Sequence, residues 1–442
     1  MMPAARSTRK WCVSINGATS TRTCRTLAPA YREASARSAS GWDPTCGDDA
    51  RALDQPGAYR TEVDRVCCDV GVMTTTTPRA FKIHVSDEQL MDLRRRVGAT
   101  RWPDEQDGVG WEQGLPVATA RELADRWVNR LDWRGVEARL NRFEQLLTVA
   151  AGARVHAVHV RAEDARAPAL VLLHGWPSTF ADYAQLIEPL SEHFHVVAPS
   201  LPGFAFSGPT PGTGWSTRKM ADAIADLMRQ LGYTRYGVHG SDMGALVGRW
   251  LGIDHAEHVT LLHACGFPGM ILGDDELTDA ERERGAGRSR YMSHHSGYAM
   301  QQSQAPQTLG YALTDSPIGQ LAWVAEKLLW AWPDPETPID RDAVLTTVGL
   351  YWHTATATSS ARAYWEAAHD GTWWRPPEPS NTPTAIAVFP NGLAGSLPIR
   401  RLYERSNTIV RWTEFDRGGH FPALEVPELL RDELVDVFLD TR

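Results

Sequence analysis

Residues 236–244 read Tyr-Gly-Val-His-Gly-Ser-Asp-Met-Gly, and this stretch decides the fold. An apolar run ends in a turn in which Gly240 and Gly244 stand two positions before and two positions after Asp242. A sharp strand-to-helix turn needs small residues at those positions, because the backbone is cramped there. If Ser241 were the nucleophile instead, a histidine and a methionine would stand at these two positions, and neither is small. The stretch predicts a nucleophile elbow that presents Asp242, with a plain helix N-cap as the alternative.

Strand and helix patterns alternate on both sides of the elbow. Apolar runs with strand character are separated by an amphipathic helix that carries Met220, Ile224 and Leu227 on one face and closes at Gly232. This alternation predicts an α/β fold with a mostly parallel central sheet flanked by helices. The expected strands cover residues 81–85, 155–160, 169–173, 195–199, 236–239, 259–262, 384–389 and 408–412.

The remaining segments divide the chain further. Ser86 and Gln89 form a capping box at the start of a helix, which belongs to a helical preface before the sheet. A stretch rich in tryptophan but without strand signals interrupts the sheet pattern, as an inserted helical lid would. We expect an extension at 1–72, an N-terminal segment at 73–150, the core at 151–267 and 381–442, and the lid at 268–380.

Residues 1–72 lack both helical and strand periodicity, and they are rich in Arg, Ser, Thr and Ala. Such a composition buries too little apolar surface to offset the entropy lost on ordering. We expect a disordered or mistranslated extension, with a transit peptide as the less favoured alternative. We expect the functional protein to begin at Met73.

Composition limits the class of protein. The chain has 442 residues, a formal charge of −9, a hydrophobic fraction of 43% and 17 tryptophans. The excess of acidic residues disfavours a nucleic-acid-binding surface. The sequence has no run of 18 apolar residues, so a membrane-spanning helix is not expected. Cys265 is the one cysteine beyond the first 72 residues, so a disulfide framework is not expected. These features favour a cytoplasmic protein without nucleic-acid or membrane partners.

A carboxylate nucleophile requires a second step. Attack on an alkyl carbon forms an ester on Asp242, which water must then hydrolyse through a tetrahedral oxyanion. In such a turn the N–H of Met243 and an N–H of an earlier loop can bind that oxyanion, and Trp176 of the stretch His-Gly-Trp-Pro at 174–177 fits the second role. His420 follows Gly418 and Gly419 near the C-terminus, where the catalytic base of this chain order falls.

From Pro78 onward the chain resembles the epoxide hydrolases of the microsomal type and their bacterial relatives, which have the α/β-hydrolase fold. The matching stretches are Arg-Trp-Pro-Asp at 101–104, His-Gly-Trp-Pro at 174–177, Pro-Gly-Phe-Ala-Phe-Ser at 202–207, Asp-Ser-Pro-Ile-Gly at 315–319, Gly-Gly-His-Phe at 418–421 and the elbow at Asp242. The resemblance implies an N-terminal segment that wraps the core and touches the lid. It also implies that Tyr298 and Tyr364 hydrogen-bond the epoxide oxygen, which leaves as an alkoxide and needs a donor of high pKa. Tyr291 and Tyr351 are nearby tyrosines without that role.

One position departs from the resemblance. The family places the acid that orients the histidine at the end of Phe-Pro-x-Glu/Asp, whereas residues 389–392 read Phe-Pro-Asn-Gly. Gly392 therefore leaves His420 without an assigned partner. Asn391 could accept the imidazole N–H, since an amide oxygen plays this part in Cys-His-Asn sites. Glu404, Glu414 and Asp416 remain alternatives.

The sequence thus predicts an epoxide hydrolase that converts an apolar epoxide and water to a vicinal diol, without a metal or organic cofactor. A haloalkane dehalogenase is the nearest rival enzyme, although Met243 stands where its halide-binding tryptophan would be. A pseudoenzyme that binds an apolar ligand is the rival without activity, supported by Gly392. The natural epoxide stays open, as do a role in detoxification or in natural-product tailoring and the choice between monomer and homodimer.

Overall fold

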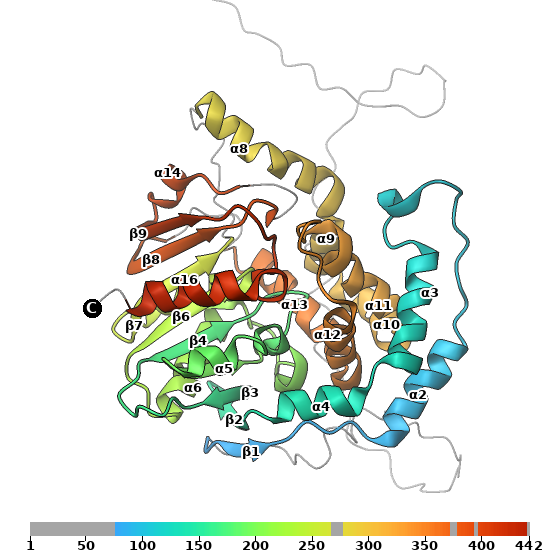
Figure 1. Ribbon diagram of the computed structural model, residues 1–442, viewed down its shortest axis with the longest axis horizontal. Coiled ribbons are helices and arrows are strands. Elements are labelled where there is room, and N and C mark those ends of the chain that lie inside the picture. Colours follow the sequence, from blue (N-terminus) through green and yellow to red (C-terminus); the bar gives the residue numbers. More distant parts are fainter. Residues whose placement is uncertain (1–75, 267–276, 372–377, 393–396, 440–442) are drawn as a thin grey trace, which may run out of the picture. The chain divides into compact units, whose positions relative to one another are not determined.

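The computed structural model describes residues 76–266, 277–371, 378–392 and 397–439, and these residues contain one nine-stranded sheet (Figure 1). Its strand order is β1-β2-β3-β5-β4-β6-β7-β8-β9. Neighbours from β5 to β9 are parallel, while β1, β2, β3 and β5 pair antiparallel. The strands are β1 (Arg79–Phe81), β2 (Gln145–Ala150), β3 (Ala153–Val160), β4 (Ala169–Leu173), β5 (His195–Pro199), β6 (Tyr236–Ser241), β7 (Val259–Cys265), β8 (Ser380–Val388) and β9 (Asn407–Glu414). The expected mostly parallel sheet is confirmed.

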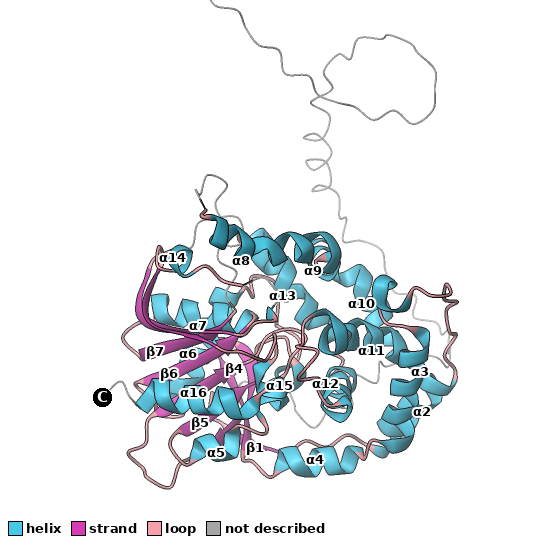
Figure 2. Cartoon of the chain, turned by 45° about the horizontal axis from the view of Figure 1, so that its top comes forward, coloured by secondary structure: helices cyan, strands magenta, loops and turns pink. Residues whose placement is uncertain are grey.

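Helices cover both faces of this sheet (Figure 2). They are α5 (Ile187–Ser191), α6 (Thr217–Gln230), α7 (Met243–Asp254), α14 (Arg400–Tyr403), α15 (Pro422–Glu425) and α16 (Pro427–Leu439). Side chains alternate along β4, so Val171 and Leu173 pack in one buried cluster with α6 and α7. Leu170 and Leu172 pack in a second cluster with α5 and α16. All four side chains have no exposed surface, which explains the uninterrupted apolar run of this strand.

The N-terminal segment departs from prediction at its start. The strand expected over residues 81–85 is wrong in extent, because β1 ends at Phe81. Ile83 and Val85 are buried, as the alternation indicated. Their N–H groups, however, donate to side chains rather than to a strand, Ile83 to Asn141 Oδ1 at 2.8 Å and Val85 to Glu137 Oε1 at 2.6 Å. The alternation therefore reports burial but not strand pairing.

Three α-helices follow in that segment, which reaches the lid. Its helices are α2 (Asp87–Gly98), α3 (Val117–Asp125) and α4 (Trp133–Asn141). The predicted capping box of Ser86 and Gln89 is present at the start of α2. Arg96 at the end of α2 donates to the Asp315 carbonyl at 3.0 Å, and the Arg126 guanidinium lies 2.6 Å from the Asp342 carboxylate.

The lid is inserted between β7 and β8, and its described residues, 277–371, are helical (Figure 1). Its helices are α8 (Asp279–Arg290), α9 (Gly297–Gln304), α10 (Pro306–Asp315), α11 (Pro317–Glu326), α12 (Arg341–Thr354) and α13 (Ala357–His369). Ser316 caps α11 by accepting from the Gly319 N–H at 3.0 Å, which gives the stretch at 315–319 a structural purpose.

Two further points concern the chain as a whole. The strand β2 had no sequence prediction, and β8 begins at Ser380, four residues earlier than expected. Among the described residues no helix has the length and apolar character needed to cross a membrane. The extension expected at residues 1–72 lies outside the described residues.

Candidate active site

Asp242 occupies the turn between β6 and α7 with backbone angles φ 51° and ψ −124°. The two flanking glycines are required by contact. A Cβ on Gly240 would lie 2.4 Å from the Gly244 carbonyl oxygen, and a Cβ on Gly244 would lie 2.1 Å from the Leu173 carbonyl oxygen. The Asp242 side chain does not cap α7, so the plain N-cap alternative does not describe this turn. The turn instead directs the carboxylate toward the end of β4.

The Asp242 carboxylate is bound at both oxygens. Its Oδ1 accepts from the Trp176 N–H at 3.0 Å, and its Oδ2 lies 3.3 Å from His420 Nε2. Gly175 makes room for this contact, because a Cβ there would lie 2.4 Å from the Asp242 Cβ. Burial raises the pKa of Asp242, but its contact with His420, the charge of that imidazole and the N–H groups of Trp176 and Met243 outweigh burial and hold the pKa below its ordinary value. The carboxylate is therefore ionised, as a nucleophile must be.

His420 approaches Asp242 from the loop between β9 and α15. Its side chain is 5% exposed, and its ring lies 4.8 Å from the Trp332 ring and 4.8 Å from the Phe421 ring, centroid to centroid. Nε2 has no well-aligned hydrogen-bond partner among the described residues, so its 3.3 Å contact with Asp242 is electrostatic. An imidazole nitrogen in this position can hold a water molecule next to the carboxylate.

The two N–H groups assigned to an oxyanion already face Asp242. Those of Trp176 and Met243 both interact with its carboxylate. The predicted mechanism would turn one oxygen of that carboxyl group into the oxyanion when water attacks an ester on Asp242. Donors that bind the carboxylate would then also face that intermediate.

Hydrogen bonds of the His174 side chain hold the loop that carries Trp176. The His174 Nδ1 contacts the Gly175 carbonyl at 3.0 Å, and its Nε2 accepts from the Leu201 N–H at 3.1 Å. These partners assign the proton to Nδ1 and a neutral ring, consistent with burial lowering the His174 pKa to about 4. The peptide bond between Trp176 and Pro177 is cis.

Both predicted tyrosines lie on the lid and face the Trp176 ring. Tyr298 of α9 stacks on Trp176 at 4.9 Å with an interplanar angle of 5°, and Tyr364 of α13 meets it edge-on at 5.8 Å. The two tyrosine rings lie 5.7 Å apart. Burial, with the Asp242 charge contributing, raises the pKa of both phenols above the ordinary value, so both remain protonated donors.

Sequence reasoning missed two lid contacts at this site. Tyr291, set aside as a tyrosine without a role, has its hydroxyl 2.8 Å from the Tyr298 hydroxyl. The Lys327 ammonium lies 5.2 Å from the centre of the Tyr298 ring and 2.7 Å from the Glu326 carboxylate. Nothing in the spacing of these residues could have indicated the contacts, because each depends on how the lid helices pack.

The acid expected near His420 is absent from its usual place. The Asn391 N–H donates to the Gly418 carbonyl at 3.3 Å, so this strand end does adjoin the histidine loop. Glu404, Glu414 and Asp416 are all exposed, and the first two pair with Arg400 at 2.8 Å and Arg284 at 2.6 Å. A Cβ on Gly392 would meet no described atom within 4 Å, so a larger residue has room there.

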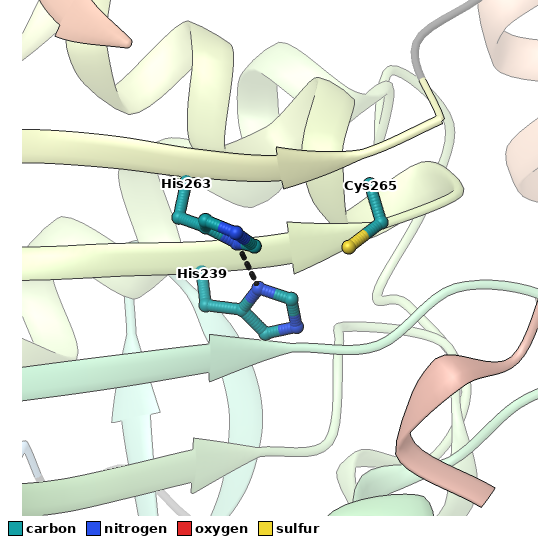
Figure 3. A group of neighbouring side chains, drawn as sticks. All are labelled: His239, His263 and Cys265. Atoms are coloured by element: carbon teal, nitrogen blue, oxygen red, sulfur yellow. Dashed lines mark hydrogen bonds between the residues drawn. The ribbon is translucent and has the colours of Figure 1, made fainter. Parts of the chain in front are cut away.

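A second cluster of buried side chains lies on the neighbouring strands β6 and β7 (Figure 3). His239, His263 and Cys265 offer ligand-type atoms within 4.8 Å of one another. The two Nδ1 atoms are 2.9 Å apart, the length of a hydrogen bond, whereas two nitrogens on one tetrahedral zinc ion would be about 3.3 Å apart. Burial lowers the pKa of His239 to about 3 and lowers that of His263 as well. A hydrogen bond between two neutral rings describes this pair.

Comparison with known proteins identifies the family of this chain. The sequence-family model for the epoxide hydrolase N terminus matches residues 78–183, and the family model for the α/β hydrolase fold matches residues 168–325. A putative epoxide hydrolase of Stigmatella aurantiaca is 38% identical over 379 residues, which cover 82% of this chain and 85% of that protein. The chain belongs to the epoxide hydrolase family.

Further relatives of this epoxide hydrolase family extend the likeness. Epoxide hydrolase 1 of Sus scrofa is 29% identical over 398 residues, covering 80% of this chain and 87% of that protein. The solved structure of Aspergillus niger epoxide hydrolase has a TM-score of 0.74 at 30% identity, covering 83% of this chain and 97% of that one. Juvenile hormone epoxide hydrolase of Bombyx mori, at 24% identity and a TM-score of 0.73, shares the fold. The predicted family and α/β-hydrolase fold are confirmed, and the chain is an enzyme of the hydrolase class.

Proposed function

We propose that this epoxide hydrolase works through a covalent ester on Asp242. An Asp242 carboxylate oxygen attacks one epoxide carbon, the carbon–oxygen bond of the ring breaks, and the ring oxygen takes a proton from Tyr364 or Tyr298. His420 then removes a proton from water, and the resulting hydroxide attacks the ester carbonyl. Trp176 and Met243 stabilise the oxyanion, and its collapse expels the diol oxygen, which takes the proton held by His420. The proton of the new carboxyl group passes to the tyrosine phenolate, so a vicinal diol is released and the carboxylate, imidazole and phenol are restored.

One observation carries this proposal. The backbone N–H of Trp176 donates to the Asp242 carboxylate at 3.0 Å, and the ring of the same residue packs against both tyrosines. A nucleophile and two phenolic donors therefore lie around one tryptophan. An epoxide needs this pairing, because its carbon must be attacked while its oxygen receives a hydrogen bond.

The substrate is an apolar epoxide. The aromatic rings of Trp176, Trp332 and Tyr298 lie within 6.3 Å of one another, centroid to centroid, beside Asp242. Such surfaces favour hydrocarbon groups over charged ones. A cytoplasmic location, a role in detoxification and a homodimer remain predictions.

Rapid mixing of the enzyme with styrene oxide, followed by acid quench and peptide mass analysis, tests the proposal. We expect the peptide with Asp242 to gain the mass of the epoxide. His420→Gln should accumulate this ester, because loss of a general base slows hydrolysis by about 10²–10⁴-fold. Asp242→Asn serves as the control without a nucleophile.

Three results would contradict the proposal. Diol formation without any ester in His420→Gln would mean that water attacks the epoxide directly. Binding of styrene oxide without ester or diol would favour a ligand-binding pseudoenzyme. Release of halide from 1-bromobutane faster than diol from styrene oxide would favour the dehalogenase alternative.

A further inference from the structure

The loop that carries His420 is held through its backbone. The Gly418 N–H donates to Asp334 Oδ2 at 2.9 Å, the His420 N–H to the Trp332 carbonyl at 3.2 Å, and the Phe421 N–H to Glu425 Oε1 at 2.7 Å. Two of these three acceptors, Trp332 and Asp334, belong to the lid. The position of His420 therefore depends on the lid as well as on the core.

Glu425 links the two sides of this contact. Its Oε1 binds the Phe421 N–H, and its Oε2 accepts from the Asp334 N–H at 2.6 Å. Asp334 in turn binds Gly418, so the two carboxylates and the loop close a ring of hydrogen bonds, which we name the carboxylate clasp (Asp334 and Glu425). Asp334 is 3% exposed and Glu425 is 9% exposed. Buried carboxylates are retained at such positions only when hydrogen bonds satisfy them.

The carboxylate clasp also explains the glycine pair before His420. Gly418 has φ +98°, a conformation that residues with a Cβ rarely adopt. A Cβ on Gly419 would lie 2.6 Å from the Asp334 nitrogen and 2.7 Å from Glu425 Oε2. The carboxylate clasp therefore occupies the space next to the loop, and the backbone before His420 must be glycine to approach it.

The carboxylate of Glu425 also interacts electrostatically with His420. Burial raises the pKa of Glu425 to about 7; the N–H groups of Asp334 and Phe421 and the charge of His420 oppose this rise, and the Asp334 charge adds to it. Glu425 thus interacts with the charge that His420 gains when it takes a proton from water.

We propose that Glu425, together with Asp334, is the positioning residue of His420 and takes the place of the acid that is missing at Gly392. The carboxylate clasp fixes the imidazole through the loop backbone and stabilises its cation through space, instead of binding the ring N–H directly. This inference rests on the proposed role of His420 in ester hydrolysis. Ester formation, which uses Asp242 and the tyrosines, does not need the carboxylate clasp.

Glu425→Gln tests the proposal in the full-length enzyme with styrene oxide at pH 8, where the wild-type carboxyl group is mostly ionised. A glutamine has one acceptor oxygen in place of two, so one of the two N–H contacts is lost. Rapid quench should show ester hydrolysis slowed at least about tenfold, short of the ~10⁴-fold that removal of a direct partner costs. Ester formation should stay within about threefold of wild type.

Glu433→Gln is the matched control. Glu433 is also buried, at 4% exposure, and also accepts two hydrogen bonds, from Arg411 at 2.8 Å and Thr413 at 2.7 Å. It lies on α16 and takes no part in the carboxylate clasp. This variant should lose thermal stability but keep the wild-type ratio of the two rate constants, which separates a positioning effect from general destabilisation.

Asp334→Asn provides a second variant should Glu425→Gln fail to fold, and it should slow ester hydrolysis selectively for the same reason. Adding Gly392→Glu to either variant should restore hydrolysis at least in part, because a direct acid replaces the carboxylate clasp. Wild-type hydrolysis rates in both folded variants, or equal slowing of both steps, would overturn the inference. Absence of any ester in wild type would overturn the proposed function instead, so the two failures are distinguishable.

Discussion

Asp242 has φ 51°, a backbone conformation that non-glycine residues rarely adopt and that costs about 1–3 kcal/mol. The surroundings compensate, because the Trp176 N–H and His420 bind its carboxylate at 3.0 Å and 3.3 Å. The strained turn keeps the carboxylate outside the regular strand and helix and directs it toward the Trp176 N–H and His420.

The two tyrosines make the next prediction at this scale. Tyr364→Phe should slow ester formation by roughly 10- to 100-fold, less than the ~10²–10⁴-fold of a sole acid, because Tyr298 still donates. Ester hydrolysis should be unchanged, since the ring oxygen has already been protonated. Rapid quench with styrene oxide measures both rates.

Tyr351→Phe is the control for this prediction. Tyr351 is fully buried and donates to the Ser178 carbonyl at 2.9 Å, so its hydroxyl has a structural partner. Equal rates of ester formation in wild type and Tyr364→Phe would remove Tyr364 from the mechanism. Equal slowing by Tyr351→Phe would show that any buried hydroxyl near the loop has the same effect.

Residues were predictable where chemistry depends on local spacing. The glycines around Asp242 indicate the turn, and the glycine pair at 418–419 indicates His420. In both places the neighbouring backbone leaves no room for a Cβ, so glycine is required. The carboxylate clasp was not predictable. Asp334 and Glu425 are 91 positions apart and bind backbone N–H groups, which leave no pattern in the sequence. The candidates between Gly392 and His420, namely Glu404, Glu414 and Asp416, are at the surface.

At the scale of elements, the elbow depends on close approach of α7 to β4. Gly244→Ala should therefore destabilise the whole enzyme, since its Cβ would lie 2.1 Å from the Leu173 carbonyl oxygen and backbone would have to move. Overpacking of this kind costs about 1–3 kcal/mol or more. Urea unfolding measures the free energy, and ester formation should fall in parallel.

Gly98→Ala is the comparison for this prediction. Gly98 ends α2, and a Cβ there would meet no described atom within 4 Å. Alanine has higher helix propensity than glycine, so this variant should be as stable as wild type or slightly more stable. Similar losses in both variants would mean that the close approach of α7 is not what the elbow requires.

Elements were predicted best where burial and hydrogen bonding agree. The strand expected over residues 195–199 is β5, because both of its faces are buried and both of its edges are paired. The alternation at 81–85 does bury Ile83 and Val85, but side chains of α4 accept from their N–H groups. Periodicity records which face is buried and does not record the hydrogen-bond partner.

At the scale of the whole molecule, buried histidines set the response to acid. In the part of the chain that the structure describes, six histidines have pKa values lowered chiefly by burial, namely His156, His174, His239, His263, His353 and, less completely buried, His159. They are neutral in the folded state but take up protons on unfolding below pH 6.5. Their stabilising contribution is complete above pH 6.5 and is lost as pH falls toward folded-state values of about 3 to 4.

Two buried acids act in the opposite sense. Burial raises the pKa of Asp182 to about 6 and that of Glu425 to about 7, so both release protons on unfolding below those values. The histidines outnumber them, and each contributes at most about 1.4 kcal/mol per pH unit. We expect the melting temperature at pH 5 to be lower than at pH 7.5 by about 10 °C. Calorimetry that finds equal melting temperatures would mean that these histidines are protonated in the folded state.

The central claim is that Asp242 forms a covalent ester with the substrate, and one measurement tests this most directly. Excess enzyme is mixed with styrene oxide in water enriched in ¹⁸O, and one turnover is allowed. We predict that the diol carries no ¹⁸O and that Asp242 gains it, because the oxygen transferred to carbon comes from the carboxylate. Label should enter the diol only in later turnovers. A first-turnover diol that carries ¹⁸O, with Asp242 unlabelled, would contradict the account.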